Sequence, residues 1–351
     1  FIFDEPTAPL NRAEVDKLET LLRRLAANGK LIFYISHRLE EIFRFCDTVT
    51  ILKDGRHVAT EPIGALTEDR LVSLMVGRPL QSLFPARRAG AAGDIALDAV
   101  DTSREGAGRR SILSLRRGEI VGLAGLEGQG QRELMRTLAG AERSVECNVV
   151  HRPVSGMPAA SIGCRGTAAM VRSGVALVPE DRKIEGLYLD LSICDNLQLG
   201  LLRGRGLHRL APRARKVVER LAEQLQLRSA RSKAVGTLSG GNQQKVMIGR
   251  WLAAGVDTLL IEQPTRGVDV GAKAEIYRLL RQFADDGGAV LAVSGDLPEL
   301  IGMCDRILVM RQRRIVADVA ADGVTEEHLL ALAIQDAPGM RGASSLARSQ
   351  A

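Results

Sequence analysis

The chain has 351 residues, enough for two domains of ordinary size, and its 45% apolar and 26% charged residues are typical of a globular protein. The sequence contains no run of about 18 apolar residues, so it predicts no membrane span. The five cysteines are odd in number and scattered, which indicates a reducing compartment rather than disulfides or a zinc site. The net charge is +6 and only 3% of the residues are aromatic. The chain therefore lacks the interleaved basic and aromatic side chains of a protein that binds single-stranded nucleic acid.

The first 85 residues alternate short apolar runs with helical patterns. The opening run, residues 1–3, ends at the acidic pair Asp4-Glu5 in the stretch FIFDEPT. The pattern then predicts helices at 12–27 and 39–45, a strand at 31–35, and a strand pair joined by the Asp-Gly turn of residues 53–56. Because fully apolar strands that alternate with helices form parallel sheets covered on both faces, we expect an α/β fold.

The same pattern returns later in the chain. Glu262-Gln263 stands where a shift of 258 residues (262 − 4) places the first acidic pair. Without a gap, that shift also aligns Pro6-Thr7 with Pro264-Thr265, Ser36 with Ser294, and Cys46-Asp47 with Cys304-Asp305. The second copy predicts strands at 258–261 and 289–293 and helices at 272–284 and 297–303. So many matches in one register indicate a repeated domain.

The repeat predicts the organisation of the chain. We expect residues 1–84 to be the C-terminal part of a first domain and residues 95–325 to be a complete second one, joined by the basic, small-residue linker 85–94. Residues 326–351 are expected to form a short helix and a flexible tail. Since the first copy lacks everything before its acidic pair, we expect the chain to be a fragment of a longer protein.

The second copy opens with a glycine-rich turn between a strand and a helix. The strand at 119–124 leads into GLEGQG, and a helix is expected from about Gln131. The frame matches the phosphate loop GxxxxGK[ST], in which the glycines let backbone N–H groups surround phosphates at a helix N-terminus. These glycines are Gly125, Gly128 and Gly130. Gln131 takes the lysine position and Arg132 the Ser/Thr position, and a plain tight turn is the alternative interpretation.

Two further stretches complete the candidate site. Residues 178–182, VPEDR, leave a strand for a loop, and a helical region follows at about 186–235. Next comes LSGGNQQK, in which Ser239, Gly240 and Gly241 are expected to cap a helix that begins near Asn242. Such a cap presents a hydroxyl, two unhindered amides and a helix dipole to an anion, although an ordinary helix cap has the same elements.

LSGGNQQK resembles the signature of ABC-type ATPases. DEPT at 4–7 resembles their Walker B motif, and ISHR at 35–38 resembles their switch-histidine segment. NQQK, VPEDRK and TRGVDVGAK are similar to tandem-domain ATP-binding subunits of bacterial monosaccharide importers, and the likeness covers about residues 1–320. It implies a P-loop NTPase fold of the ABC type, a helical subdomain, and ATP with Mg²⁺ as cofactors. In that family each of two sites combines one domain's P-loop, Walker B and switch His with the other domain's signature.

By that resemblance the first site is complete in its chemical groups. Asp4 would hold magnesium, Glu5 would polarise the attacking water and His37 would contact the γ-phosphate, together with the signature of the other domain. The signature residues are Ser239, Gly240, Gly241 and Gln243. Taken alone, His37 could be a structural histidine at a strand end. We expect this site to hydrolyse ATP.

The second site departs from the family pattern wherever chemistry is needed. The departures are Gln131 for Lys, Arg132 for Ser/Thr, Glu262 for Asp, Gln263 for the catalytic Glu, Gly295 for the switch His, and Glu180 for the loop glutamine. Asp269 is also assigned to this site. A neutral amide at Gln263 cannot act as a general base. We therefore expect this site to bind nucleotide weakly or only to hold shape.

The resemblance implies the ATP-binding subunit of a sugar importer on the cytoplasmic face of the bacterial inner membrane. Its partners would be integral membrane permease subunits, docking near residues 178–182, and indirectly a periplasmic sugar-binding protein, with no nucleic acid. Two alternatives stay open: a soluble, non-transport ABC ATPase acting in translation or repair, and a catalytically incompetent fragment.

Overall fold

The computed structural model describes residues 1–4, 6–7, 10, 12–36, 38–53, 55–76, 83–87, 93–101, 110–142, 147–152, 160–163, 166–201, 211–227 and 232–334. The chain divides into two compact units, one built mainly from residues 1–83 and the other from most of residues 84–351. None of the helices in these described ranges is both long and apolar enough to cross a bilayer.

The first unit contains two small sheets and three α-helices among its described residues. Strand β1 (Ile2–Asp4) pairs in parallel with β2 (Phe33–Ile35), and β3 (Thr48–Lys53) pairs antiparallel with β4 (Arg56–Pro62). The helices are α1 (Arg12–Ala27), α2 (Leu39–Phe45) and α3 (Glu68–Val76), with a 3₁₀ turn, η1, at Ile63–Ala65. Ile42, Ile51 and Leu71 form the buried centre of this unit, where α2 and α3 meet β3.

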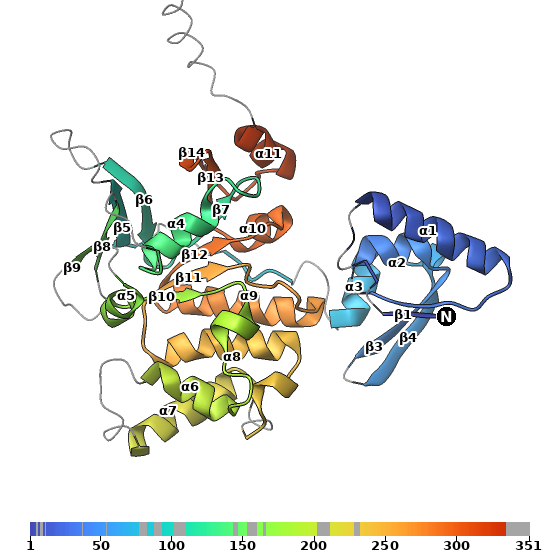
Figure 1. Cartoon of the computed structure of the whole chain (residues 1–351), viewed down its shortest axis with the longest axis horizontal. Helices are drawn as coiled ribbons and strands as arrows, with labels where there is room; N and C mark the ends of the chain where they lie inside the picture. Colours follow the sequence, from blue (N-terminus) through green and yellow to red (C-terminus); the bar gives the residue numbers. More distant parts are fainter. Residues whose placement is uncertain are drawn as a thin grey trace, which may run out of the picture. The chain divides into compact units, whose positions relative to one another are not determined.

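A six-stranded sheet forms the middle of the second unit (Figure 1). Its order is β10 (Val175–Val178), β11 (Thr258–Glu262), β12 (Ala289–Val293), β7 (Ile120–Ala124), β13 (Arg306–Arg311) and β14 (Arg314–Ala320). The first five strands run parallel, and β14 pairs antiparallel with β13. The α/β fold predicted from the apolar runs is confirmed. Since parallel strands end at one edge, the loops after β7, β10, β11 and β12 come together there.

A second, antiparallel sheet packs into the same core. Its order is β6 (Arg110–Arg116), β5 (Ile95–Asp101), β8 (Cys147–His151) and β9 (Ala160–Gly163). Leu97, Leu115 and Val149 from this sheet share one buried cluster with Leu123 and Leu291 of the parallel sheet. The sequence analysis did not predict this sheet.

The remaining helices cover the sheets and build a separate helical layer. Helices α4 (Gln131–Leu138), α5 (Thr167–Ser173), α9 (Val270–Asp285), α10 (Leu297–Met303) and α11 (Glu326–Ile334) surround the sheets. The helical layer contains the π-helical turn η3 (Arg182–Gly186), α6 (Ile193–Leu201), α7 (Ala211–Gln224), the 3₁₀ turn η6 (Val235–Thr237) and α8 (Gly240–Ala253). At Gly200 a Cβ atom would collide with the carbonyl oxygen of Arg250, so only glycine lets α6 cross α8 this closely.

Several predicted boundaries agree with the structure. The helices at 12–27, 39–45 and 297–303 and the strand at 289–293 have the predicted bounds. The helix expected from Asn242 begins two residues earlier, at Gly240, because Ser239 is its N-cap. Phe84, which we expected to end the first domain, and Arg87 of the expected linker both pack within the second unit: Phe84 stacks on Tyr277 and the Arg87 guanidinium donates to the Cys304 carbonyl at 3.0 Å. The tail expected at residues 337–351 lies outside the described residues, which end at residue 334.

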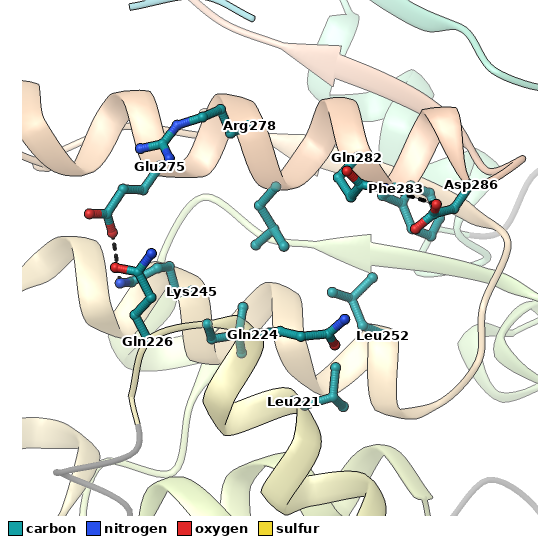
Figure 2. A pocket seen from close by; sticks show the side chains of 12 residues that line it. Leu221, Gln224, Gln226, Lys245, Leu252, Glu275, Arg278, Gln282, Phe283 and Asp286 are labelled. Carbon is teal, nitrogen blue, oxygen red and sulfur yellow. Dashed lines mark hydrogen bonds and ion pairs between the residues drawn. The ribbon is translucent and has the colours of Figure 1, made fainter. Parts of the chain in front are cut away.

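A cavity of about 510 Å³ lies between α7, α8 and α9 (Figure 2). Leu221, Leu252 and Phe283 contribute apolar side chains to it. At its rim the Lys245 ammonium donates to the Glu275 carboxylate at 2.8 Å, which ties α8 to α9. No sequence motif pointed to this cavity.

Candidate functional site

The glycine-rich turn joins the buried strand β7 to α4 at the C-terminal edge of the parallel sheet. Its backbone is left-handed at Gly125, Gly128 and Gly130. A Cβ atom at Gly125 would collide with the carbonyl oxygen of Met310 and the side-chain amide of Gln131, so the turn requires glycine there. The buried Gln131 amide donates to the Leu126 carbonyl at 3.0 Å. The lysine position of a phosphate loop is therefore filled by a neutral donor that lies within the loop.

Arg132 follows in the Ser/Thr position and faces three carboxylates. Its guanidinium nitrogens lie 3.8 Å from oxygens of Glu180, Glu185 and Glu262. The Arg132 side chain is 51% exposed, whereas that of Glu262, at the end of β11, is only 2% exposed. The half-exposed Arg132 guanidinium therefore places a positive charge near the buried Glu262 carboxylate.

Arg136 binds the same buried carboxylate more closely, one helical turn after Arg132 on α4. Its Nε lies 3.1 Å from one Glu262 oxygen and its Nη2 lies 3.3 Å from the other, while Nη2 also donates to Glu185 at 2.6 Å. Burial raises the pKa of Glu262, and the Arg136 guanidinium offsets part of that rise. The two arginines and Glu262 thus form one ion-pair network.

The loop after β10 joins this network. The Glu180 backbone N–H donates to Glu262 at 3.1 Å, and the Glu180 carboxylate forms an ion pair with Arg266. Arg132, Arg266 and Glu180 line a cavity of about 400 Å³, together with Asp181, Arg182, Lys183 and Gly267. Four of the lining side chains are cationic and two are anionic.

The ends of β11 and β12 meet through Gln263 and Gly295. The Gln263 backbone is left-handed, and its side-chain oxygen accepts the Gly295 N–H at 3.2 Å. The structure therefore brings together the positions predicted for the catalytic carboxylate and the switch histidine. Asp269, which the sequence analysis assigned to the same site, caps α9 by accepting the Ala272 N–H at 3.0 Å.

The signature stretch begins α8. Ser239 is the N-cap residue and its hydroxyl makes no capping hydrogen bond to the first turn. At Gly240 a Cβ atom would collide with the carbonyl oxygen of Gly267, so the helix start lies directly against the loop after β11. Gly241 and Gln243 are buried behind it, and the Gln243 amide donates to the Leu238 carbonyl at 3.1 Å.

Arg182, the last residue of the VPEDR stretch, connects three of these segments. Its Nε donates to the Gln243 side-chain oxygen at 3.2 Å. Its two terminal nitrogens donate to the carbonyls of Arg266 at 2.7 Å and Gly267 at 3.1 Å. Because burial outweighs the nearby Asp181, the pKa of Arg182 lies below its ordinary value. The arginine side chain thus ties the loop after β10 to the signature helix and to the loop after β11.

A buried glutamate holds the loop after β11 against the loop after β12. Glu299 accepts hydrogen bonds from the hydroxyl of Thr265 at 2.6 Å, of Tyr277 at 3.0 Å and of Ser294 at 2.5 Å. Its exposed fraction is 3%. Since Thr265 lies two residues after Gln263 and Ser294 directly precedes Gly295, the Glu299 clamp positions both.

The first unit repeats this clamp with Glu41. The Glu41 carboxylate accepts from Thr7 at 2.6 Å and from Tyr34 and Ser36 at 2.9 Å each. Burial alone raises the pKa of Glu41, but the hydrogen bonds from these three hydroxyls and the charge of Arg38 together outweigh burial, so the pKa lies below its ordinary value of 4.5. Thr7, Ser36 and Glu41 stand at the same offset of 258 residues from Thr265, Ser294 and Glu299.

Of the three chemical groups predicted in the first copy, one is described. Asp4 ends β1 with its side chain exposed. Glu5 and His37 lie outside the described residues. Their neighbours Thr7 and Ser36 are both held by Glu41.

Sequence reasoning missed Arg136, Glu185 and Arg266 as parts of the site, and it named Arg182 only as the last residue of the stretch 178–182. For Arg136 a signal was present, because residues four apart on a helix share one face and Arg132 had been singled out. Arg182 acts through backbone carbonyls, which no residue pattern identifies.

Comparisons with known proteins identify the family of part of the chain. The ABC transporter family matches residues 109–266. A ribose import ATP-binding protein of Streptomyces avermitilis is 44% identical over 95% of this chain and 65% of its own length. An arabinose import ATP-binding protein of Burkholderia thailandensis is 42% identical over 95% of this chain and 63% of its own length. The chain therefore spans less than two thirds of the length of these relatives.

Solved structures give the same fold. A nucleotide-free ATP-binding cassette from an ABC transporter has a TM-score of 0.53 at 21% identity, over 67% of this chain and 94% of that chain. The ADP conformation of an ATP-binding cassette has a TM-score of 0.53 at 20% identity, over 67% of this chain and 93% of that chain. The second unit has the ABC ATPase fold of the P-loop NTPase class. Residues 109–266 are thus a domain of the ABC transporter family, and the relatives named above are sugar import ATP-binding proteins.

Proposed function

We propose that this chain is part of the ATP-binding subunit of a carbohydrate importer, which couples ATP binding and hydrolysis to sugar uptake through separate permease subunits. The observation that carries the proposal is an intact signature on α8 in a domain whose own phosphate loop lacks both lysine and hydroxyl. Because the phosphate loop of this domain lacks the usual lysine and hydroxyl, we assign the retained signature to a nucleotide that is bound by the phosphate loop of another domain. The names of the relatives support sugar as the transported substrate class.

The hydrolytic chemistry belongs to the first copy. Asp4 would hold Mg²⁺, for which an exposed carboxylate is a suitable oxygen ligand, and the ion would neutralise phosphate charge. Glu5 acts as the general base for water and His37 contacts the γ-phosphate. On the resemblance alone, Ser239, Gly240, Gly241 and Gln243 serve as the signature for an ATP of this kind. The Glu41 clamp supports these roles, because it holds residues that flank both groups.

The site at the second phosphate loop does not hydrolyse ATP. Gln263 donates and accepts hydrogen bonds but cannot take a proton from water at neutral pH. Gly295 offers no imidazole to a γ-phosphate. This site either binds nucleotide weakly or has only a structural role that supports the first site.

Transport requires partners outside this chain. We assign the loop of residues 178–182 and the helical region at about 186–235 to contact with integral membrane permease subunits. Arg182 supports this route, since it links that loop to the signature helix and to Gly267. A periplasmic sugar-binding protein would act indirectly, and the subunit would lie on the cytoplasmic face of the bacterial inner membrane without binding nucleic acid. Residues 1–84 and 95–325 would be the two ATPase copies, 85–94 their linker and 326–351 an appended helix and tail.

The proposal is tested by steady-state ATPase assays on the complete transporter. Glu5→Gln should lower turnover by about two to four orders of magnitude, the usual contribution of a general base. The matched change Gln263→Ala, at the equivalent position of the second copy, should leave turnover within about twofold, because no proton transfer is lost there. The reverse pattern would overturn the assignment of the two sites.

Co-purification tests the transport role separately. The subunit should be retained by a polytopic membrane protein extracted in mild detergent. Tight binding to RNA or DNA, without such retention, would favour a soluble ABC ATPase and contradict the proposal.

A further inference from the structure

At a phosphate loop of this class, a loop hydroxyl and a Walker B carboxylate hold magnesium from two sides. In the second unit the hydroxyl position is Arg132, and the carboxylate position is Glu262. The Arg132 Nε lies 3.8 Å from Glu262 and its Nη1 lies 3.8 Å from Glu180, at the loop-glutamine position. A guanidinium thus reaches towards both groups that would otherwise face the metal.

The Glu262 carboxylate has little capacity left for a metal. Arg136 contacts both of its oxygens, at 3.1 and 3.3 Å, in a two-point pair. The Glu180 backbone N–H also donates to one of them at 3.1 Å. With the carboxylate 2% exposed and already paired, a divalent cation would have to displace a guanidinium to reach it. The residues present therefore do not fit Mg²⁺.

The same residues suit an anion. The adjoining cavity of about 400 Å³ is lined by four cationic and two anionic side chains. Arg132 reaches it with a half-exposed side chain, held by three contacts of 3.8 Å that are longer than hydrogen bonds. A planar guanidinium offers several donors that match phosphate oxygens. Arg132 can thus turn towards a polyphosphate while Arg136 keeps Glu262 neutralised.

We propose that the second phosphate loop is a magnesium-independent site for the polyphosphate of a nucleotide, in which the Arg132 guanidinium replaces the divalent cation. The inference rests on the proposed function only in treating this loop as a nucleotide site. Gln131 contributes a neutral donor, and the left-handed glycine turn contributes backbone N–H groups. Nucleotide bound here is held without the ion that hydrolysis needs.

The test is equilibrium binding of a fluorescent, non-hydrolysable ATP analogue to the 351-residue chain, which carries one phosphate-loop sequence. Titrations are run with EDTA and with excess MgCl₂. The two dissociation constants should agree within about threefold, less than the tenfold change that corresponds to 1.4 kcal/mol. Binding at least about tenfold tighter with magnesium would overturn the inference.

Two variants locate the effect. Arg132→Gln should weaken binding in EDTA about tenfold, as expected for the loss of a charged hydrogen bond. The control Arg215→Gln removes an exposed arginine of α7 and should leave binding unchanged. The triple change Gln131→Lys, Arg132→Ser and Arg136→Ala restores the loop's usual residues and frees the Glu262 carboxylate, and binding should then tighten at least about tenfold with magnesium. Equal weakening by Arg132→Gln and Arg215→Gln would contradict the proposed role of Arg132.

The inference and the proposed function fail in different ways. Absence of analogue binding by the unaltered chain in both buffers would overturn the inference and leave the transporter's dependence on Glu5 untouched. Magnesium-independent binding together with an ATPase insensitive to Glu5→Gln would uphold the inference and overturn the assignment of the hydrolytic site.

Discussion

Strands β1 and β11 occupy equivalent places in the two copies of the repeat, yet their surroundings differ. In β11 all five residues are buried, because β10 and β12 pair with it on either side. In β1, within the part of the chain that the structure describes, pairing is with β2, and Ile2 is 75% exposed. The same apolar pattern thus yields a core strand only where neighbouring strands and covering helices are present.

The loops that follow these strands are nevertheless held alike. Glu41 and Glu299 each accept hydrogen bonds from a threonine and a serine at matching positions. Tyrosines complete both clamps but come from different elements, Tyr34 from β2 and Tyr277 from α9. The scaffold around the candidate chemical positions is therefore kept in both copies, while the groups at those positions differ.

The largest effect is expected from removing the Glu299 clamp. Glu299→Ala leaves three hydroxyl groups without their acceptor in a buried site, and should lower the free energy of unfolding of the second unit by about 3 kcal/mol or more. Urea unfolding followed by the fluorescence of Trp251, the one tryptophan in the sequence, reports on that unit. Glu219→Ala, on the exposed part of α7, is the control. A loss below about 1 kcal/mol would show that the clamp does not hold the two loops.

Arg182→Ala is expected to act on turnover. Without its bonds to Gln243 and Gly267, the signature helix loses its register against the loop after β11. ATPase activity of the complete transporter should fall about ten- to hundredfold, as for other misplaced catalytic segments. Arg182→Lys keeps the positive charge but loses the forked donors of the guanidinium, so the ATPase activity of this variant should fall nearly as far. Full activity in the lysine variant would mean that charge alone matters.

A smaller effect concerns pH and the Glu41 clamp. Because hydrogen bonds lower the pKa of folded Glu41 below 4.5, its stabilising contribution is fully present above pH 4.5 and is lost as pH falls through the lowered value. Glu41→Gln should therefore reduce the acid sensitivity of the first unit. Hydrogen exchange of β2 amides between pH 6 and pH 3, corrected for intrinsic rates, measures this. An unchanged acid sensitivity would contradict the clamp's role in the first unit.

The smallest effect is expected at the switch position of the second copy. A Cβ atom at Gly295 would meet only the Gln263 amide, at an ordinary contact distance of 3.7 Å. Gly295→His should therefore change the free energy of unfolding by no more than about 0.5 kcal/mol. ATPase activity should stay at the level of the unaltered transporter, since Gln263 still cannot act as a base. A gain in turnover would show that the missing histidine alone silences this site.

Much of the parallel architecture could be predicted because its signals are local. Helices such as α1 and α10 were predicted with their observed bounds from periodicity and turn residues. The antiparallel sheet of β5, β6, β8 and β9 was not predicted; its β5–β8 pair joins strands that lie far apart in the sequence. Its Leu97 and Val149 become interpretable as core residues only when they pack with Leu123 of the parallel sheet.

The candidate site divides in the same way. The sequence by itself predicted the repeat, the substituted positions at Gln131, Arg132, Glu262, Gln263 and Gly295, and the intact signature, because these depend on residue identity and register. Only the tertiary structure decided that Arg136 forms an ion pair with the Glu262 carboxylate, which lies 126 residues away in the sequence. It also decided that Arg182 donates hydrogen bonds to carbonyls of the loop after β11. The physical reason is that an ion pair depends on a few ångströms of spatial separation, which the folded sheet edge creates and residue order does not encode.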